Sequence, residues 1–222
     1  MRQRKPLIFI LLATLLFSGC VKNGTSSDKS TALNNSSSAN GNKATSGKNT
    51  TQTAMADFFL PDGSKAHFEG EGNEFAELDI EVARLIENYV VIHENNGGSI
   101  VRYVYKIEED TIQVLDNITV GTKKDVPSKE EMDAMKPIGI YLKMPFEKGV
   151  SFDKWTIIDI DATVETPYKK FEHAIVIEMK DKDFVNRKYL VEGYGEVKRE
   201  SVMQVEGEED FVVTSKLKLV DK

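Results

Sequence analysis

Cysteine is almost absent from this sequence. Cys20 is the only cysteine among 222 residues. A single cysteine excludes an intramolecular disulfide, so a hydrophobic core must stabilise the folded part without covalent cross-links.

Basic residues are outnumbered by acidic ones. The chain carries 29 Lys and Arg against 36 Asp and Glu, a formal net charge of −7, which falls to near −10 if residues 1–19 are removed. Neutralisation of phosphate by Lys and Arg supplies much of the affinity for nucleic acid, and polybasic segments attract anionic lipid. The composition therefore argues against a nucleic-acid partner.

No apolar run is long enough to cross a bilayer. The longest spans residues 7–17, eleven residues, whereas a membrane-spanning helix needs about 20. Arg2, Arg4 and Lys5 precede it. A basic start followed by a short apolar run is typical of a signal peptide.

The small residues that close this run give Cys20 a role. Leu16, Ser18, Gly19 and Cys20 resemble the lipobox of bacterial lipoproteins, in which a peptidase cuts before a cysteine that carries lipid. The resemblance implies a signal peptide over residues 1–19 and a covalent diacylglycerol or acyl lipid, such as palmitate, on Cys20. Two or more chains hold a protein stably on a membrane, so we expect a lipid-anchored protein on the extracytoplasmic face of the cell membrane.

A polar linker follows the lipobox. Of the 31 residues at 23–53, 22 are Ser, Thr, Asn or Gly, and Leu33 is the only large apolar one. Such a segment cannot bury enough apolar surface to offset the entropy of ordering it. We therefore expect residues 20–54 to form a disordered tether that carries the lipidated cysteine, and residues 55–222 to form one folded domain.

Alternating apolar and polar residues predict a mainly β domain. At 155–165, Ile158, Ile160 and Val164 alternate with polar residues, which is typical of a half-buried strand. Residues 95–98 read Asn-Asn-Gly-Gly between two such runs, a tight hairpin signal. We predict a single antiparallel, strongly curved sheet, sandwich or half-open barrel of about nine or ten strands.

Two segments bear on the helix content. Residues 75–86 fit both a helical stripe and a strand alternation; the alternation of Leu78, Ile80 and Val82 with acidic residues favours a strand. Residues 116–137 are mostly polar. Within them, Ser128 with Glu131 three positions later forms a capping-box pattern, which predicts one short helix that ends before Pro137.

The predicted domain also resembles a family. Its spaced motifs cover residues 72–76, 96–99, 142–146, 164–168 and 189–197, with Gly149 and Trp155 between them. Over about residues 57–203 the sequence resembles an uncharacterised family of exported proteins and lipoproteins from Bacillus- and Clostridium-type bacteria. Glu196 stands where that family tends to have Leu. The resemblance implies a β-rich domain and no catalytic residue.

Common catalytic and metal motifs are missing. The sequence has no Gly-x-Ser-x-Gly elbow and no Gly-x₄-Gly-Lys phosphate loop. His67, His93 and His173 are far apart, whereas zinc sites use closely spaced pairs. These histidines are more typical of structural positions, so we expect no metal and no cofactor beyond the lipid.

Acidic residues and aromatics are the remaining candidates. Asp159 and Asp161 lie two apart on a predicted strand, a spacing that suits carboxylate-based hydrolysis or calcium, and equally a solvated strand face. The acidic run 206–210 could hold a cation or form a hairpin loop. Tyr103, Tyr105 and Trp155 could face a ligand or pack within the sheet.

The sequence favours a non-enzymatic binding or envelope-accessory module on a lipid anchor. Its partners would be the bilayer and an unknown envelope protein or apolar ligand. The alternative is a cell-wall-acting hydrolase that uses the carboxylates above.

Overall fold

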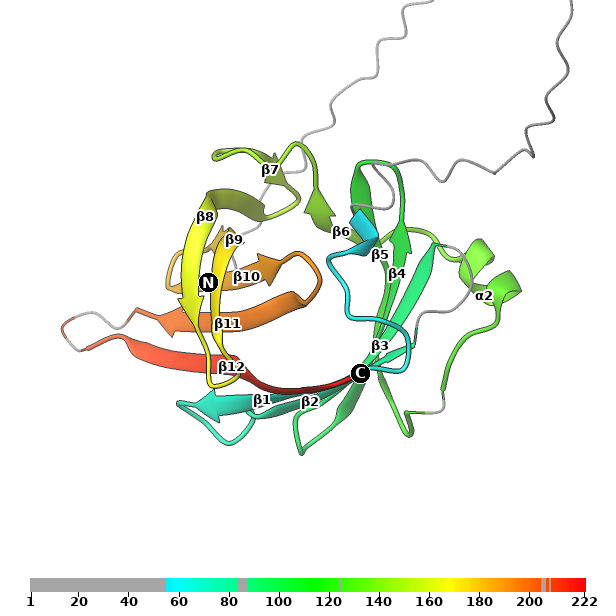
Figure 1. Cartoon of the computed structure of the whole chain (residues 1–222), viewed down its shortest axis with the longest axis horizontal. Coiled ribbons are helices and arrows are strands. Elements are labelled where there is room, and N and C mark those ends of the chain that lie inside the picture. The colour runs from blue at the N-terminus through cyan, green and yellow to red at the C-terminus, as the bar shows by residue number, and fades with distance from the viewer. Residues whose placement is uncertain (1–54, 84–87, 124, 205–206, 208) are drawn as a thin grey trace, which may run out of the picture. The chain divides into compact units, whose positions relative to one another are not determined.

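The computed structural model describes residues 55–83, 88–123, 125–204, 207 and 209–222. Within this part twelve strands and one complete short helix follow one another along the chain (Figure 1). The elements are β1 (Lys65–Glu71), β2 (Leu78–Ala83), β3 (Tyr89–Asn95), β4 (Ile100–Ile107), β5 (Thr111–Val120), α2 (Lys129–Ala134), β6 (Gly139–Lys143), β7 (Ser151–Phe152), β8 (Trp155–Glu165), β9 (Lys170–Lys180), β10 (Phe184–Val191), β11 (Gly195–Met203) and β12 (Phe211–Asp221).

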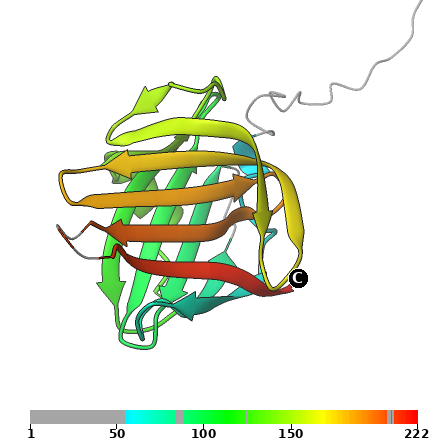
Figure 2. The same ribbon diagram turned by 90° about the vertical axis from the view of Figure 1, so that its left-hand side faces the viewer.

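All twelve strands belong to one antiparallel sheet in the order β6-β5-β4-β3-β2-β1-β12-β11-β10-β9-β8-β7. Every neighbouring pair is consecutive in the chain except β1 and β12, which join the two halves of the sheet. Figures 1 and 2 show the sheet curling so that the two halves face each other across the interior. The domain is a half-open barrel, one of the predicted architectures, and the sandwich alternative is wrong.

The two terminal strands approach each other where the barrel would close. Among the described residues no β ladder joins β6 to β7. The Asp153 carboxylate instead accepts a hydrogen bond from the backbone N–H of Ile140, at 2.6 Å. One side chain therefore supplies an acceptor to the free edge of β6, which would otherwise be open to another strand.

The main core fills the concave side of the sheet. The segment just before β1 lies inside it, with Met55, Phe58, Phe59 and Leu60 all buried. Gly195 makes room for this segment, because its φ is +74° and a Cβ there would lie 2.6 Å from the carbonyl oxygen of Phe58. The backbone of Gly193 also donates to the Asp57 carbonyl at 2.7 Å, so the segment is bound to the β10–β11 turn.

A smaller core lies on the outer face of the sheet. Met132 of α2 packs there against Tyr89, Val91, Val104 and Leu115. This second contact explains why β3 is buried on both faces near its start, whereas most strands alternate.

Several local predictions are confirmed. Residues 96–99 connect β3 to β4 in a hairpin, with Gly97 at φ +81° and the Asn96 side chain accepting from the Gly98 and Ser99 amides. Ser128 and Glu131 form the predicted capping box of α2. The ambiguous stretch contains strand β2 at Leu78–Ala83, which confirms the strand over the helix, and residues 84–87 lie outside the described part.

The predicted strand number and some boundaries are wrong. Twelve strands are present rather than nine or ten. One of the strands not predicted is the two-residue β7, which is too short to show any alternation. β5 continues to Val120 rather than ending near Leu115, because residues 117–119 form the exposed end of a strand that is still paired with β4. β10 begins at Phe184 rather than near Tyr189, since charged residues obscure its alternation.

Candidate ligand-binding site

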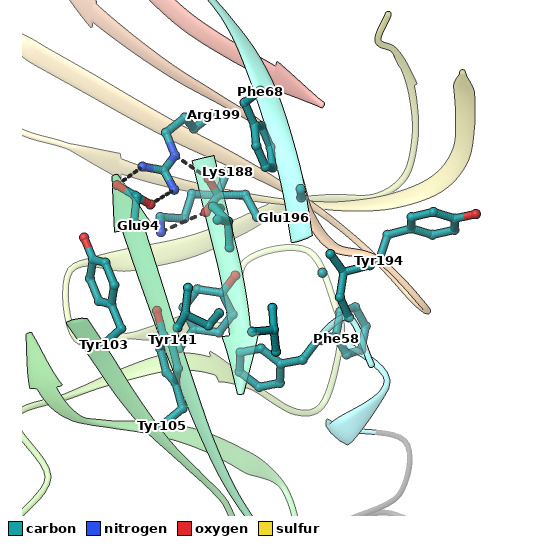
Figure 3. Close-up of a pocket in the computed structure, with 17 residues that line it drawn as sticks. Phe58, Phe68, Glu94, Tyr103, Tyr105, Tyr141, Lys188, Tyr194, Glu196 and Arg199 are labelled. Atoms are coloured by element: carbon teal, nitrogen blue, oxygen red, sulfur yellow. Dashed lines mark hydrogen bonds and ion pairs between the residues drawn. The ribbon is translucent and has the colours of Figure 1, made fainter. Parts of the chain in front are cut away.

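A cavity of about 60 Å³ lies within the concave side of the sheet. It combines an apolar wall, an aromatic wall and four charged side chains (Figure 3). Its lining residues are Phe58, Phe59, Leu60, Ala66, Phe68, Ile80, Val82, Ile92, Glu94, Tyr103, Tyr105, Tyr141, Lys188, Tyr194, Gly195, Glu196 and Arg199. An apolar concavity with a few converging polar groups is the usual form of a small-molecule site.

The aromatic wall is built by strands β4 and β6 together with the segment before β1. Phe59 contacts both Tyr105, at 5.2 Å between ring centroids, and Tyr141, at 5.8 Å. Tyr103 stacks on Tyr105 at 6.1 Å, because residues two apart on a strand share a face. In Figure 3 the hydroxyl ends of Tyr103, Tyr105 and Tyr141 point toward the charged side of the cavity.

The four charged residues form one ion-pair cluster, the quartet of Glu94, Lys188, Glu196 and Arg199. Arg199 binds Glu94 in a bidentate pair at 2.9 and 2.7 Å, and its Nε donates to Glu196. The second Glu196 oxygen pairs with the Lys188 ammonium at 3.0 Å. Paired, hydrogen-bonded charges of this kind can be kept in a low-dielectric interior.

A β-bulge makes this cluster possible. Glu196 and Arg199 are three residues apart on β11, a spacing that would normally place them on opposite faces. The register between β10 and β11 shifts between Tyr189 and Leu190, whose partners are Lys198 and Glu196, so Val197 is the extra residue. The bulge reverses the alternation and turns both side chains inward, while Lys188 lies directly across from Arg199.

Glu196 stays ionised and the tyrosines stay neutral. Burial raises the pKa of Glu196, but Arg199 and Lys188 outweigh it and lower that pKa to about 2. Burial, followed by the charge of Glu94, raises the pKa of Tyr103 to about 12. Burial likewise raises the pKa of Tyr105 and Tyr141, so all three hydroxyls carry their proton at neutral pH.

Two of the three aromatic residues singled out from the sequence line this cavity. Tyr103 and Tyr105 are in its wall. Trp155 lies beside it, with the Lys188 ammonium 5.9 Å from its ring and 5.2 Å from that of Tyr141. Sequence reasoning missed the quartet; the only signal was Glu196, which departs from the family pattern at an otherwise apolar position.

A second hollow is larger but less defined. Its volume is about 240 Å³, and Phe58, Phe146, Ile160, His173, Ile175 and Glu192 line it. It is more open than the first and has only two polar side chains. Because no ion pair or hydrogen bond joins those two in the described structure, the first cavity is the better candidate.

The paired aspartates do not form one site. Asp159 pairs with Lys148 at 3.2 Å and also accepts from the backbone amides of Ile160 and Asp161, which lower its pKa together with Lys148. Asp161 pairs separately with His173 at 2.5 Å, and its side chain is 74% exposed. Neither aspartate lines the cavities described above.

The other histidines also have local partners. His67 pairs with Asp79 at 3.0 Å, and buried His93 contacts the Asp125 carbonyl through Nε2 at 3.0 Å. In the part of the chain that the structure describes, no group of three or more His, Cys, Asp or Glu is arranged to hold a metal ion. No helix of this part is long and apolar enough to cross a membrane.

Several predicted positions lie outside the described residues. They are Leu16, Ser18, Gly19 and Cys20 of the lipobox, the rest of the tether, and Glu206 and Glu208 of the acidic run 206–210.

The fold and the cavity together define a half-open β barrel with an internal polar cluster. No protein-family profile matches this chain, and no curated protein matches it. Two solved structures are similar in fold. One, from Bacteroides fragilis, is named as an exported protein with a YmcC-like fold and has 15% identity and a TM-score of 0.49. The other, from Parabacteroides distasonis, is named as a lipoprotein and has 13% identity and a TM-score of 0.47.

Each alignment covers 74% of this chain and 98% of the other. Both proteins come from Bacteroides-type bacteria, so neither supports the attribution to Bacillus- and Clostridium-type bacteria.

Proposed function

We propose that this protein is a lipid-anchored extracytoplasmic lipoprotein whose β barrel binds a small, partly apolar ligand without transforming it. The anchor would be a diacylglycerol or acyl lipid on Cys20, and residues 20–54 would hold the domain away from the outer face of the cell membrane. The basic start, short apolar run and small residues before Cys20 support the anchor.

The observation that carries the binding proposal is the mixed lining of the internal cavity. Apolar side chains such as Phe68 and Val82 face it from one part of the sheet, and the quartet faces it from another. Apolar residues of the same volume usually stabilise a fold at least as much as a buried ion pair does. If this region served only as a stable core, apolar residues would therefore be expected here. The retained charges therefore favour recognition of a ligand.

The single tryptophan offers a direct test. Trp155 lies near Lys188 at the edge of the cavity, so a bound molecule should change its emission. We expect the neutral fluorescent probe N-phenyl-1-naphthylamine to bind in a saturable, one-to-one manner. Ala66→Leu and Ile80→Phe, which fill the cavity, should each weaken binding at least tenfold, while Ala134→Leu on exposed α2 should not.

Thermal unfolding of each variant separates loss of the cavity from loss of the fold. If the cavity-filling variants fold and still bind the probe with the affinity of the unaltered protein, the proposal is contradicted. Absence of any saturable binding would contradict it as well.

The anchor is tested separately. In the full chain expressed in a bacterial host, Cys20→Ala should move the protein from the membrane fraction to the soluble extracytoplasmic fraction. If the Cys20→Ala protein still sediments with the membranes in the absence of detergent, another feature of the chain holds it there.

An envelope protein is the second candidate partner, and one surface favours it. Phe184, Met203 and Phe211 are direct cross-strand neighbours on β10, β11 and β12, and all three are exposed. Adjacent exposed apolar side chains often mark protein contacts. Crosslinking of the full-length protein in its own envelope, with Phe184→Ser and Phe211→Ser as controls, tests this candidate independently of the cavity.

A further inference from the structure

We infer that the cavity binds an uncharged, slender amphiphile with an alkyl chain and a head group rich in hydrogen-bond acceptors, such as a hydroxylated or sugar head. This inference rests on the proposed binding function and names the class of ligand. The charges, the free hydrogen-bond donors, and the shape and lining of the cavity each support it.

The charges of the lining balance. Its charged side chains are two acids, Glu94 and Glu196, and two bases, Lys188 and Arg199. An anionic or cationic ligand would add an uncompensated charge to a partly buried site, which is costly. The acidic chain, with a formal net charge of −7, also disfavours an anion.

The negative charge of both carboxylates is already balanced within the quartet. Both Glu94 oxygens accept from Arg199, and the two Glu196 oxygens pair with Arg199 and Lys188. A cationic ligand would therefore find no unpaired counter-charge. The quartet therefore recognises no positive head group in its present arrangement.

Donors, by contrast, remain available. An ammonium has three N–H groups, and Lys188 has one carboxylate partner, its other contacts being the faces of Tyr141 and Trp155. The hydroxyls of Tyr103, Tyr105 and Tyr141 make no hydrogen bond to another described residue and point toward the quartet (Figure 3). A head group with several oxygen acceptors would satisfy these donors without adding charge.

The rest of the cavity suits an alkyl chain. Phe68, Val82 and Ile92 contribute apolar lining, and Ile92 lies directly across from Tyr103. The volume of about 60 Å³ holds about four water-sized groups, so the cavity takes part of one slim apolar group rather than a two-chain lipid, and the rest of the ligand would extend out of it. Burial of a chain stabilises the complex by ~0.8 kcal/mol per methylene, so most affinity would come from the tail and most selectivity from the head.

Three probes with one tail and different heads test this inference. They are n-octyl-β-D-glucoside, octyl sulfate and octylammonium, each used below its critical micelle concentration and followed by Trp155 emission and calorimetry. We expect the glucoside to bind at least tenfold more tightly than either charged probe. Tyr103→Phe and Tyr105→Phe should each weaken glucoside binding about threefold to tenfold, and Tyr89→Phe, on the outer face of the sheet, should leave it unchanged.

A charge variant sharpens the test. Glu196→Gln leaves two bases against one acid in the quartet, so it should shift the preference toward octyl sulfate. The same shift is not expected for Glu130→Gln on the exposed helix, which serves as the matched control. A melting curve for each variant verifies that it is folded.

The outcomes separate this inference from the proposed function. Binding of N-phenyl-1-naphthylamine together with a preference for octyl sulfate or octylammonium overturns the ligand class and leaves the pocket standing. Equal binding of all three octyl probes also overturns the class. Failure of every probe, the naphthylamine included, overturns both.

Discussion

Two arginines, one on each face of the sheet, serve different purposes. Arg199 faces the interior and joins Glu94, Glu196 and, through Glu196, Lys188 beside a cavity. Arg102 on β4 binds Asp116 at 2.5 Å and Asp125 at 2.6 Å, and it lines neither cavity. Both arginines bridge two acids, yet only the first lies where a ligand could reach.

The difference lies in what each cluster connects. Asp125 belongs to the segment between β5 and α2, and His93 also contacts its carbonyl. The Arg102 cluster therefore fastens a long connection to the sheet. The quartet connects β3 to β10 and β11, strands from opposite halves of the sheet. It holds the two halves at a fixed separation, and this separation defines the cavity.

Removal of Arg199 should have the largest effect. Arg199→Met would leave Glu94 and Glu196, whose side chains are only 12% and 8% exposed, without their main partner. Breaking a buried ion pair in this way costs about 3–5 kcal/mol. Urea unfolding should show that loss, and Lys218→Met, which breaks a surface pair with Glu69, should cost less than ~1 kcal/mol. Equal effects of the two variants would mean that the quartet is not a stabilising buried cluster.

Acid should weaken the quartet in a defined pH range. The pKa of Glu196 falls from an ordinary value of 4.5 to about 2 in the fold. A carboxyl group whose pKa is lowered by folding stabilises the fold fully when the pH is above its pKa in the unfolded chain. This contribution is lost as the pH falls from about 4.5 to 2. The loss should be on the order of 3 kcal/mol.

Glu196→Gln checks this assignment. Unfolding free energies measured at pH 6, 4 and 2.5 should fall less steeply for this variant than for the unaltered protein. Glu130→Gln on the exposed helix should keep the original slope. An unchanged slope in Glu196→Gln would place the acid sensitivity elsewhere.

The sequence predicts the parts of this fold that depend on neighbouring residues. Alternation predicted β8 at its observed bounds but not its buried face, since register shifts interrupt the strand and leave Ile158 and Ile160 exposed. Asn96 and Gly97 predicted a hairpin, and Ser128 with Glu131 predicted a helix start. The quartet depends instead on a register shift at Val197 and on the meeting of Glu94 with Arg199, 105 positions later. Neither feature leaves a periodic pattern, because a bulge is set by pairing with another strand.

The Arg102 cluster should contribute less than the quartet. Arg102→Met leaves Asp116 mostly buried, but the Asp125 side chain is 48% exposed and can return to water. We therefore expect a loss of about 2–3 kcal/mol, less than for Arg199→Met, which leaves two acids that are both mostly buried. The variant should still bind N-phenyl-1-naphthylamine as the unaltered protein does, since Arg102 does not line the cavity. Loss of probe binding in a folded Arg102→Met protein would show that the two clusters are coupled through the sheet.

The smallest expected effect concerns the helix on the outer face. Ser128 accepts from the Glu131 amide at 3.2 Å, and Glu131 accepts from the Ser128 amide at 2.8 Å. Ser128→Ala removes the first bond and should cost about 1 kcal/mol. Thermal unfolding should show this decrease, while probe affinity should stay constant because α2 packs through Met132 on the face opposite the cavity. A change in affinity without a change in stability would contradict the division of the sheet into a structural outer face and a ligand-binding inner face.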